Sequence, residues 1–164
     1  MITSIDSFIA YFESIRRRTI TYVRAIPGDR VDWAPAPGEF SCADLVRHLA
    51  AAELMFAGAV AEGRWRYAGH AGVPAEPLPS LLSRLAASHA QALGALRALD
   101  DAVLSEPRPT LDGPPTKAWR LLMAMVEHEI HHRSQIASYL AQIGVAPPQI
   151  YGLGVEDVIA RLTG

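Results

Sequence analysis

The sequence predicts an all-α protein, a four-helix bundle with a short extra helix near its C-terminus. Four long segments carry apolar residues at three- and four-residue steps, which is the spacing of one helix face. Loops rich in glycine and proline separate these segments. No segment shows sustained period-two alternation, so we expect almost no strand. Four amphipathic helices can bury their apolar faces together in a bundle, and up-down-down-up connections are compatible with this pattern.

The first predicted helix covers residues 4–25, and Pro27 and Gly28 stop it. Its apolar stripe consists of Ile5, Phe8, Ile9, Phe12, Ile15, Thr19, Tyr22 and Val23. The second predicted helix covers residues 42–61. Ser41 has the character of its N-cap, and Asp44 stands at the third helical position, so the pair is close to a capping box.

The third predicted helix covers residues 78–99, and the fourth covers residues 116–143. Gly144 fits the C-terminal cap of the fourth helix, and Pro147 and Pro148 prevent its continuation. A short fifth helix is expected over residues 155–162. A chain of 164 residues is long enough for one full core and short for two, so we expect one domain over residues 1–164.

Charge and composition exclude several classes of function. The formal net charge is −2 and the arginines are scattered, so nothing indicates a nucleic-acid surface. The one basic cluster is Arg16, Arg17 and Arg18, which we expect on a solvated helix face. No stretch approaches 18 uninterrupted apolar residues, so we expect no membrane span.

The single cysteine and the N-terminal segment favour a cytoplasmic location. Cys42 cannot form an internal disulfide, which fits a reducing compartment. It stands at a helix start, where a thiolate would be favoured, but we expect a small buried residue because no nearby sequence completes a nucleophile. Residues 1–10 lack a basic leader and a long apolar core, so they do not have the pattern of a signal peptide.

Three histidines form the candidate metal site. His128 and His132 are four residues apart, so on a helix their rings project from nearly the same face. Two imidazoles in that arrangement can hold one divalent metal ion, and a catalytic site usually adds a third protein ligand. His48 is the third candidate, because it shares an inward stripe of the second helix with Leu45 and Leu49. A hydrogen-bonded core histidine is the alternative for His48.

Other polar residues near this motif have less certain roles. His131 lies about 60° around the helix from His128, so it could donate to a metal ligand, contact a substrate or lie partly exposed. Glu129 lies about 100° from His128 and could orient a metal ligand or face solvent. We expect His70, in a loop, and His89, on the third helix, to be structural or exposed.

The same segment also satisfies the HExxH pattern of zinc proteases, with Glu129 as the general base. The metzincin continuation fails, because no glycine and third histidine follow at the required spacing. Glu156 stands at a distance that a gluzincin tolerates. However, such proteases align extended substrate on a sheet edge, and we expect almost no strand here. The pattern therefore favours a metal site and disfavours proteolysis.

These residues resemble the DinB/YfiT-like putative metalloenzyme family. The resemblance covers nearly the whole chain and rests on the loop at residues 33–41, on the helix with Leu45 and His48, and on the block at residues 128–136. Residues 144–148 with Tyr151 and Gly152 are also similar. The family's HHRGQ reads HHRSQ here. Ser134 replaces the glycine and remains small enough for helix packing.

The resemblance implies a four-helix bundle that binds a divalent metal, commonly zinc or nickel, through His48, His128 and His132. It also implies frequent homodimers and, in some relatives, transferases or isomerases that use low-molecular-weight thiols. Our leading hypothesis is therefore a metal-dependent enzyme acting on a small molecule, with thiol transfer favoured slightly over hydrolysis. The second hypothesis is a non-enzymatic metal-binding stress-response module. The third is a helical bundle with core histidines and no metal.

Overall fold

The fold was analysed in a computed structural model, which describes residues 2–163, so the two end residues of the predicted domain lie outside it. Five α-helices are present in this range: α1 (Ile5–Arg24), α2 (Cys42–Glu62), α3 (Leu78–Arg97), α4 (Ala118–Gln142) and α5 (Val155–Thr163). Two short 3-10 helices, η1 (Gly28–Arg30) and η2 (Asp101–Ser105), lie in the connections. The strands β1 (Pro107–Arg108) and β2 (Thr116–Lys117) pair in antiparallel register, with Pro107 opposite Lys117.

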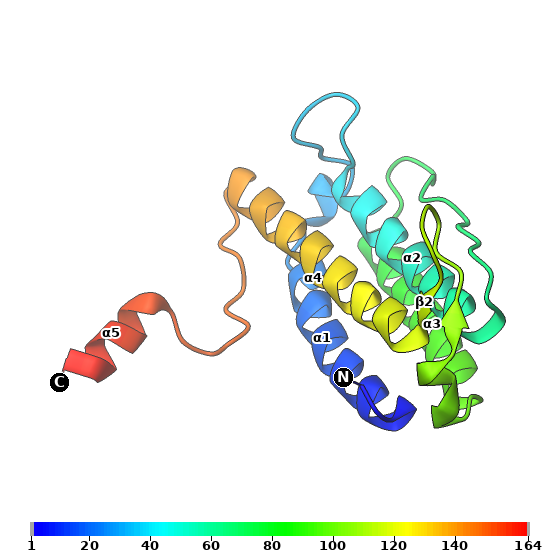
Figure 1. The fold of residues 1–164 in the computed structure, drawn as a ribbon. Coiled ribbons are helices and arrows are strands. Elements are labelled where there is room, and N and C mark those ends of the chain that lie inside the picture. The colour runs from blue at the N-terminus through cyan, green and yellow to red at the C-terminus, as the bar shows by residue number, and fades with distance from the viewer. Residues whose placement is uncertain (1, 164) are drawn as a thin grey trace.

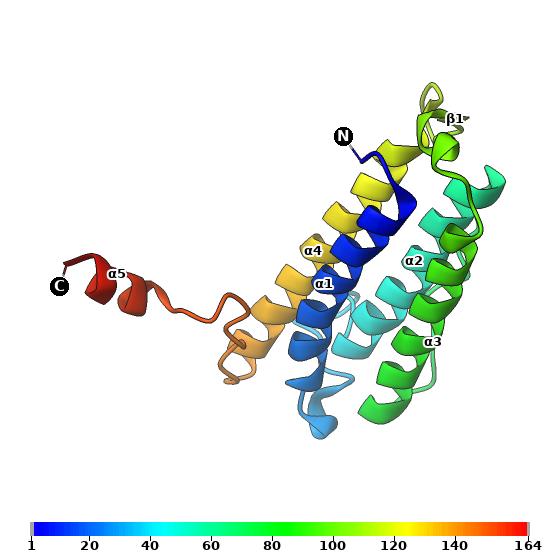
Figure 2. The same ribbon diagram turned by 90° about the horizontal axis from the view of Figure 1, so that it is seen from below.

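Helices α1 to α4 form a bundle with up-down-down-up connections, as Figures 1 and 2 show. Helix α2 packs against α3 and α4, and α1 packs against the same two helices. Because α2 and α3 are parallel neighbours, residues 63–77 must return along the length of the bundle to begin α3. We call this segment the crossover. Helix α5 stands apart from the bundle in Figure 1, and none of its described residues is buried.

The helix ends follow from local chemistry. The Ser41 hydroxyl accepts from the Asp44 backbone N–H at 3.1 Å, and the Asp44 carboxylate accepts from the Ser41 N–H at 3.0 Å, so the predicted capping box is confirmed. Gly144 follows α4 with φ +80°, a conformation that favours glycine. The prediction was wrong at the start of α4. Residues 116–117 form β2 instead, because they pair with β1.

A layer of buried charge divides the core into two apolar clusters. One cluster fills the end of the bundle that contains Phe8 and Leu122, and the other fills the end that contains Val23 and Leu140. Between them, Arg16 of α1 lies 2.5 Å from Glu53 of α2 and 3.2 Å from Glu129 of α4, all three side chains being almost fully buried.

The expectation that Arg16 lies on a solvated face was wrong. Arg16 stands four residues after Phe12 and three before Thr19, both of which are buried, so its side chain is directed into the bundle. Arg17 is exposed, as expected. Cys42 is buried, and this burial raises the pKa of its thiol to about 11, so the prediction of a small buried residue is confirmed. Within residues 2–163, no helix is both long and apolar enough to cross a membrane.

Candidate metal centre

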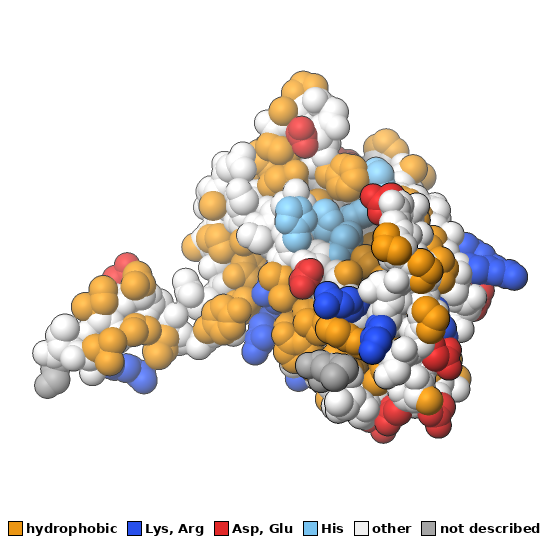
Figure 3. Space-filling view, viewed as in Figure 1, with side chains coloured by type: hydrophobic (Ala, Val, Ile, Leu, Met, Phe, Trp, Pro, Cys, Tyr) orange, Lys and Arg blue, Asp and Glu red, His pale blue; other side chains and the backbone are white. Residues whose placement is uncertain are grey.

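The three predicted histidines meet on the face where α2 and α4 pack together. His48 Nε2 lies 2.9 Å from His128 Nε2 and 3.1 Å from His132 Nε2, and the latter two atoms are 3.1 Å apart. All three side chains are half-buried. Figure 3 shows histidine side chains gathered in one patch, with hydrophobic side chains around it. The helical spacing and the antiparallel packing of α2 on α4 together create this cluster.

Burial keeps these imidazoles neutral. It lowers the pKa of His48 from the ordinary 6.5 to about 4, and the nearby His132 and His70 add to this shift. It lowers the pKa of His128 to about 3, again with repulsion from the neighbouring histidines. The pKa of His132 is also lowered by burial, even though its bond to Gln135 acts in the opposite direction. At neutral pH all three rings therefore carry a free lone pair.

Hydrogen bonds fix which nitrogen carries that lone pair. His132 Nδ1 lies 2.5 Å from Gln135 Oε1, an acceptor, so Nδ1 carries the proton and Nε2 is bare. His48 Nδ1 lies 2.6 Å from the Tyr67 hydroxyl, which lies 2.9 Å from His70 Nδ1. If His48 Nδ1–H donates to Tyr67 and Tyr67 donates to His70, every member of this chain is satisfied and His48 Nε2 is also bare.

The bare Nε2 atoms of His48 and His132, 3.1 Å apart, repel one another unless a cation or a donated proton lies between them. Zinc binds imidazole nitrogen at about 2.0–2.1 Å, and ligands at that radius on one face of an ion are separated by about 3 Å. The residues present therefore fit a divalent metal. The hydrogen bonds to Gln135 and Tyr67 are of the kind that orient histidine ligands in metal sites.

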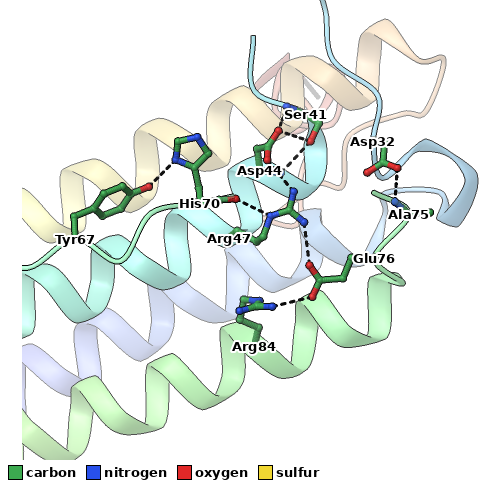
Figure 4. Close-up of polar contacts among 9 residues, drawn as sticks. All are labelled: Asp32, Ser41, Asp44, Arg47, Tyr67, His70, Ala75, Glu76 and Arg84. Atoms are coloured by element: carbon green, nitrogen blue, oxygen red, sulfur yellow. Dashed lines mark hydrogen bonds and ion pairs between the residues drawn. The ribbon is translucent and has the colours of Figure 1, made fainter. Parts of the chain in front are cut away.

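A buried arginine holds the crossover that carries Tyr67 and His70. Arg47 Nε donates to the His70 carbonyl at 2.8 Å, while its two Nη atoms bind Asp44 at 2.8 Å and Glu76 at 2.9 Å (Figure 4). All three groups of the guanidinium are thus occupied by acceptors. Gly72 lies against this guanidinium, since a Cβ added there would stand 2.5 Å from Arg47 Cζ. The crossover is therefore fixed where it passes the histidines.

Glu129, the glutamate of the HExxH pattern, lies in the buried charged layer of the core and not in the histidine cluster. Glu129 is buried against Arg16 in the core layer, and burial raises the pKa of its carboxyl group. Glu53 joins the same layer and binds His89 Nδ1 at 2.6 Å, so neither residue belongs to the histidine cluster. A protease base must reach a water at the metal. Because Glu129 contacts Arg16 in the core, it is not placed to accept a proton from a water at the histidine cluster, which counts against proteolysis.

The structure also places the histidines that lie outside the cluster. His131 is exposed, with its ring centroid 4.9 Å from that of His132, so it flanks the site at the surface. His89 is structural, as expected, through its contact with Glu53. Sequence reasoning missed the connection of His70 and Tyr67 to His48. Tyr67 stands 19 residues and His70 stands 22 residues after His48 by subtraction, in a loop without helical periodicity that could have indicated this connection.

The fold and site together define a helical-bundle protein with a three-histidine candidate metal centre. The chain belongs to the DinB family, whose sequence model matches residues 1–161. No curated protein matches it significantly.

Solved structures share the fold. A DinB-like protein from Bacillus cereus ATCC 10987 is 18% identical with a TM-score of 0.79, over 92% of this chain and 100% of that one. The DinB-like protein YjoA from Bacillus subtilis is 23% identical with a TM-score of 0.71, over 88% and 96%. YfiT from Bacillus subtilis is 18% identical with a TM-score of 0.66, over 87% and 89%. YfiT is described as "a probable metal-dependent hydrolase with an unusual four-helix bundle topology".

Proposed function

We propose that this protein is a metal-dependent enzyme whose divalent cation, zinc or nickel, is held by His48, His128 and His132. The observation that supports the proposal is the convergence of three neutral imidazole nitrogens within 3.1 Å of one another. The description of YfiT as a metal-dependent hydrolase agrees with it.

The donor set supports an open metal site. Among the described residues, the cluster consists of these three histidines, and no carboxylate or thiolate joins it. Catalytic zinc sites have three protein ligands and an open position, whereas structural sites are closed by four. The non-enzymatic module requires a closed shell, so the donor set favours the enzyme.

A cation on three neutral ligands keeps its full charge and acts as a Lewis acid toward a substrate oxygen, a water or a thiol. The protein's own residues position the centre. Gln135 and Tyr67 hold the rings of His132 and His48, and the crossover covers one side of the site. Cys42 is buried with a raised pKa, so it does not supply a thiolate nucleophile to the site. We propose hydrolysis by water or transfer of a low-molecular-weight thiol to a small electrophile.

Metal analysis tests the first part of this proposal. Protein prepared without a histidine tag should carry about one divalent ion per chain by elemental analysis. The variants His48→Ala and His132→Ala should lose that ion. His131→Ala is the matched control, because it removes an exposed imidazole beside the site and should keep the metal. Retention of metal by His48→Ala would refute the assignment.

Activity assays test the second part. The metal-loaded protein should be screened against neutral activated esters with water alone, and against electrophiles with added small thiols. Turnover in either screen should disappear in the His132→Ala variant. It should also disappear on chelation and, in the unsubstituted protein, return when metal is added. Activity that survives both treatments would show that the reaction does not use this centre.

A further inference from the structure

A cavity of about 360 Å³ lies beside His48 of the histidine cluster. It is lined by His48, Met55, Trp65, Tyr67 and Leu111. Met55 stands two helical turns after His48 on α2, so both face the same side of that helix. Trp65 and Tyr67 come from the first part of the crossover, and Leu111 comes from the loop between β1 and β2. Three separate chain segments therefore build one compartment, and a metal ligand forms part of its wall.

The walls of this compartment are fixed to the metal centre. Trp65 Nε1 donates to the Pro109 carbonyl at 2.8 Å, which ties the crossover to the loop between the strands. The Trp65 ring packs edge-on against Phe56, with centroids 5.6 Å apart, and Phe56 packs in the same way against His128 at 5.7 Å. Tyr67 is bonded to His48. The compartment thus adjoins His48 directly, and Phe56 connects its Trp65 to His128.

The chemistry of the lining selects for an uncharged guest. No charged side chain lines the cavity. The Tyr67 hydroxyl and His48 Nδ1 are already bonded to one another, and Trp65 Nε1 is bonded to the Pro109 carbonyl. A carboxylate or phosphate placed there would lose part of its hydration and meet no charged partner, which is unfavourable. An aromatic or branched aliphatic group would instead bury apolar surface against Trp65, Met55 and Leu111. The volume falls within the range of small-molecule sites.

We infer that the substrates of this centre carry a metal-binding polar group joined to an uncharged apolar group, which occupies the cavity of Met55, Trp65, Tyr67 and Leu111. This inference rests on the proposed function, because the metal places the polar group. Specificity for the apolar group resides in the crossover, the loop between β1 and β2, and the face of α2 that carries Met55. Leu111 is the most exposed lining residue, at 71%, and forms the outer edge.

Hydroxamates of varied tail test the inference on the zinc-loaded full-length protein by calorimetry, since their head group binds metal whatever the tail. Benzohydroxamate and phenylacetohydroxamate supply an apolar ring, acetohydroxamate supplies a methyl group, and 4-carboxybenzohydroxamate supplies a charged ring. The better of the two neutral aromatic probes should bind about tenfold more tightly than acetohydroxamate. The charged probe should lose most of that gain.

Substitutions of Leu111, at the outer edge of the cavity, test whether the cavity causes the preference for aromatic probes. Leu111→Asp should reduce the aromatic preference by about threefold or more, and Leu111→Lys should restore binding of the charged probe. Leu162→Asp is the matched control, because it makes the same change at an exposed leucine of α5 and should alter nothing. Both positions are exposed, so folding is not at risk.

The outcomes separate the two proposals. If the protein binds neither zinc nor nickel, the proposed function fails and this inference fails with it. If zinc and acetohydroxamate bind but neither aromatic probe binds better, the metal centre stands and the apolar cavity is refuted as the substrate site. Equal effects of Leu111→Asp and Leu162→Asp would also refute it.

Discussion

Replacing Arg16 by leucine should destabilise the bundle by about 3–5 kcal/mol, because it leaves two buried carboxylates without their cation. Arg16 is 1% exposed and lies 2.5 Å from Glu53 and 3.2 Å from Glu129. Removing one member of a buried charged group is costly since the remaining charges keep their desolvation penalty. Arg17→Leu is the matched control. Arg17 is exposed, and its loss should change stability by less than about 0.5 kcal/mol.

The destabilisation should depend on pH. Burial raises the pKa of Glu129, and the charge of Arg16 acts to lower it. Without Arg16 that pKa rises further, so folded Glu129 binds a proton that the unfolded chain releases at neutral pH. A carboxyl group with a raised folded pKa contributes stability at low pH and loses it as pH rises. The gap between Arg16→Leu and Arg17→Leu should therefore be wider at pH 8 than at pH 5.5.

Chemical denaturation in the presence of a chelator measures these differences without a contribution from metal binding. The midpoint of thermal unfolding should also fall by about 6–20 °C in Arg16→Leu, at about 2–4 °C per kcal/mol for a chain of this size. Adding Glu53→Gln and Glu129→Gln should recover part of the loss, because it removes the unpaired charges. The reasoning is refuted if Arg16→Leu and Arg17→Leu unfold within 1 kcal/mol of one another at pH 8.

Three further predictions concern the site and the crossover. Zinc affinity should fall by far less than about a thousandfold between pH 7.5 and 5.5 in a chelator competition assay. A thousandfold is the loss expected of three rings with ordinary pKa values, whereas burial lowers the pKa of all three site histidines. Tyr67→Phe should weaken zinc binding by about tenfold in the same assay, since His48 Nδ1 loses its partner, and unchanged affinity would dismiss that role. Gly72→Ala should cost about 1–3 kcal/mol in denaturant because its Cβ would meet the held Arg47 guanidinium. Gly94→Ala on α3 is the control for Gly72→Ala. An added Cβ meets open space there, so this substitution should instead stabilise the folded protein by about 0.5–1 kcal/mol.

The helices and their caps were predictable because their causes are local. The stripe from Ile5 to Val23, the Ser41–Asp44 capping box and Gly144 after α4 depend on residues within a few positions of one another. The pairing of His128 with His132 is local in the same sense, since one helical turn separates them.

Charged residues were harder to place, because their positions depend on partners far along the chain. In the sequence, Arg16 is one of three neighbouring arginines and has the pattern of a surface residue. In the folded bundle, Glu53 and Glu129 lie beside it and make its burial possible. Glu129 reads as a protease base until the same packing turns it toward the core. A buried charge is tolerated only where such partners exist, so a single segment cannot reveal it.

The sequence by itself determined a helical bundle with three candidate metal-ligating histidines, because periodicity sets which side chains share a helix face. Only the tertiary structure decided how those histidines are oriented and what lies beside them. Tyr67, His70 and the apolar cavity with Leu111 come from the crossover and the loop between β1 and β2, which have no repeating pattern. Their positions are set by the clamp of Arg47 and the bond of Trp65 to Pro109, contacts that exist only after the helices have packed.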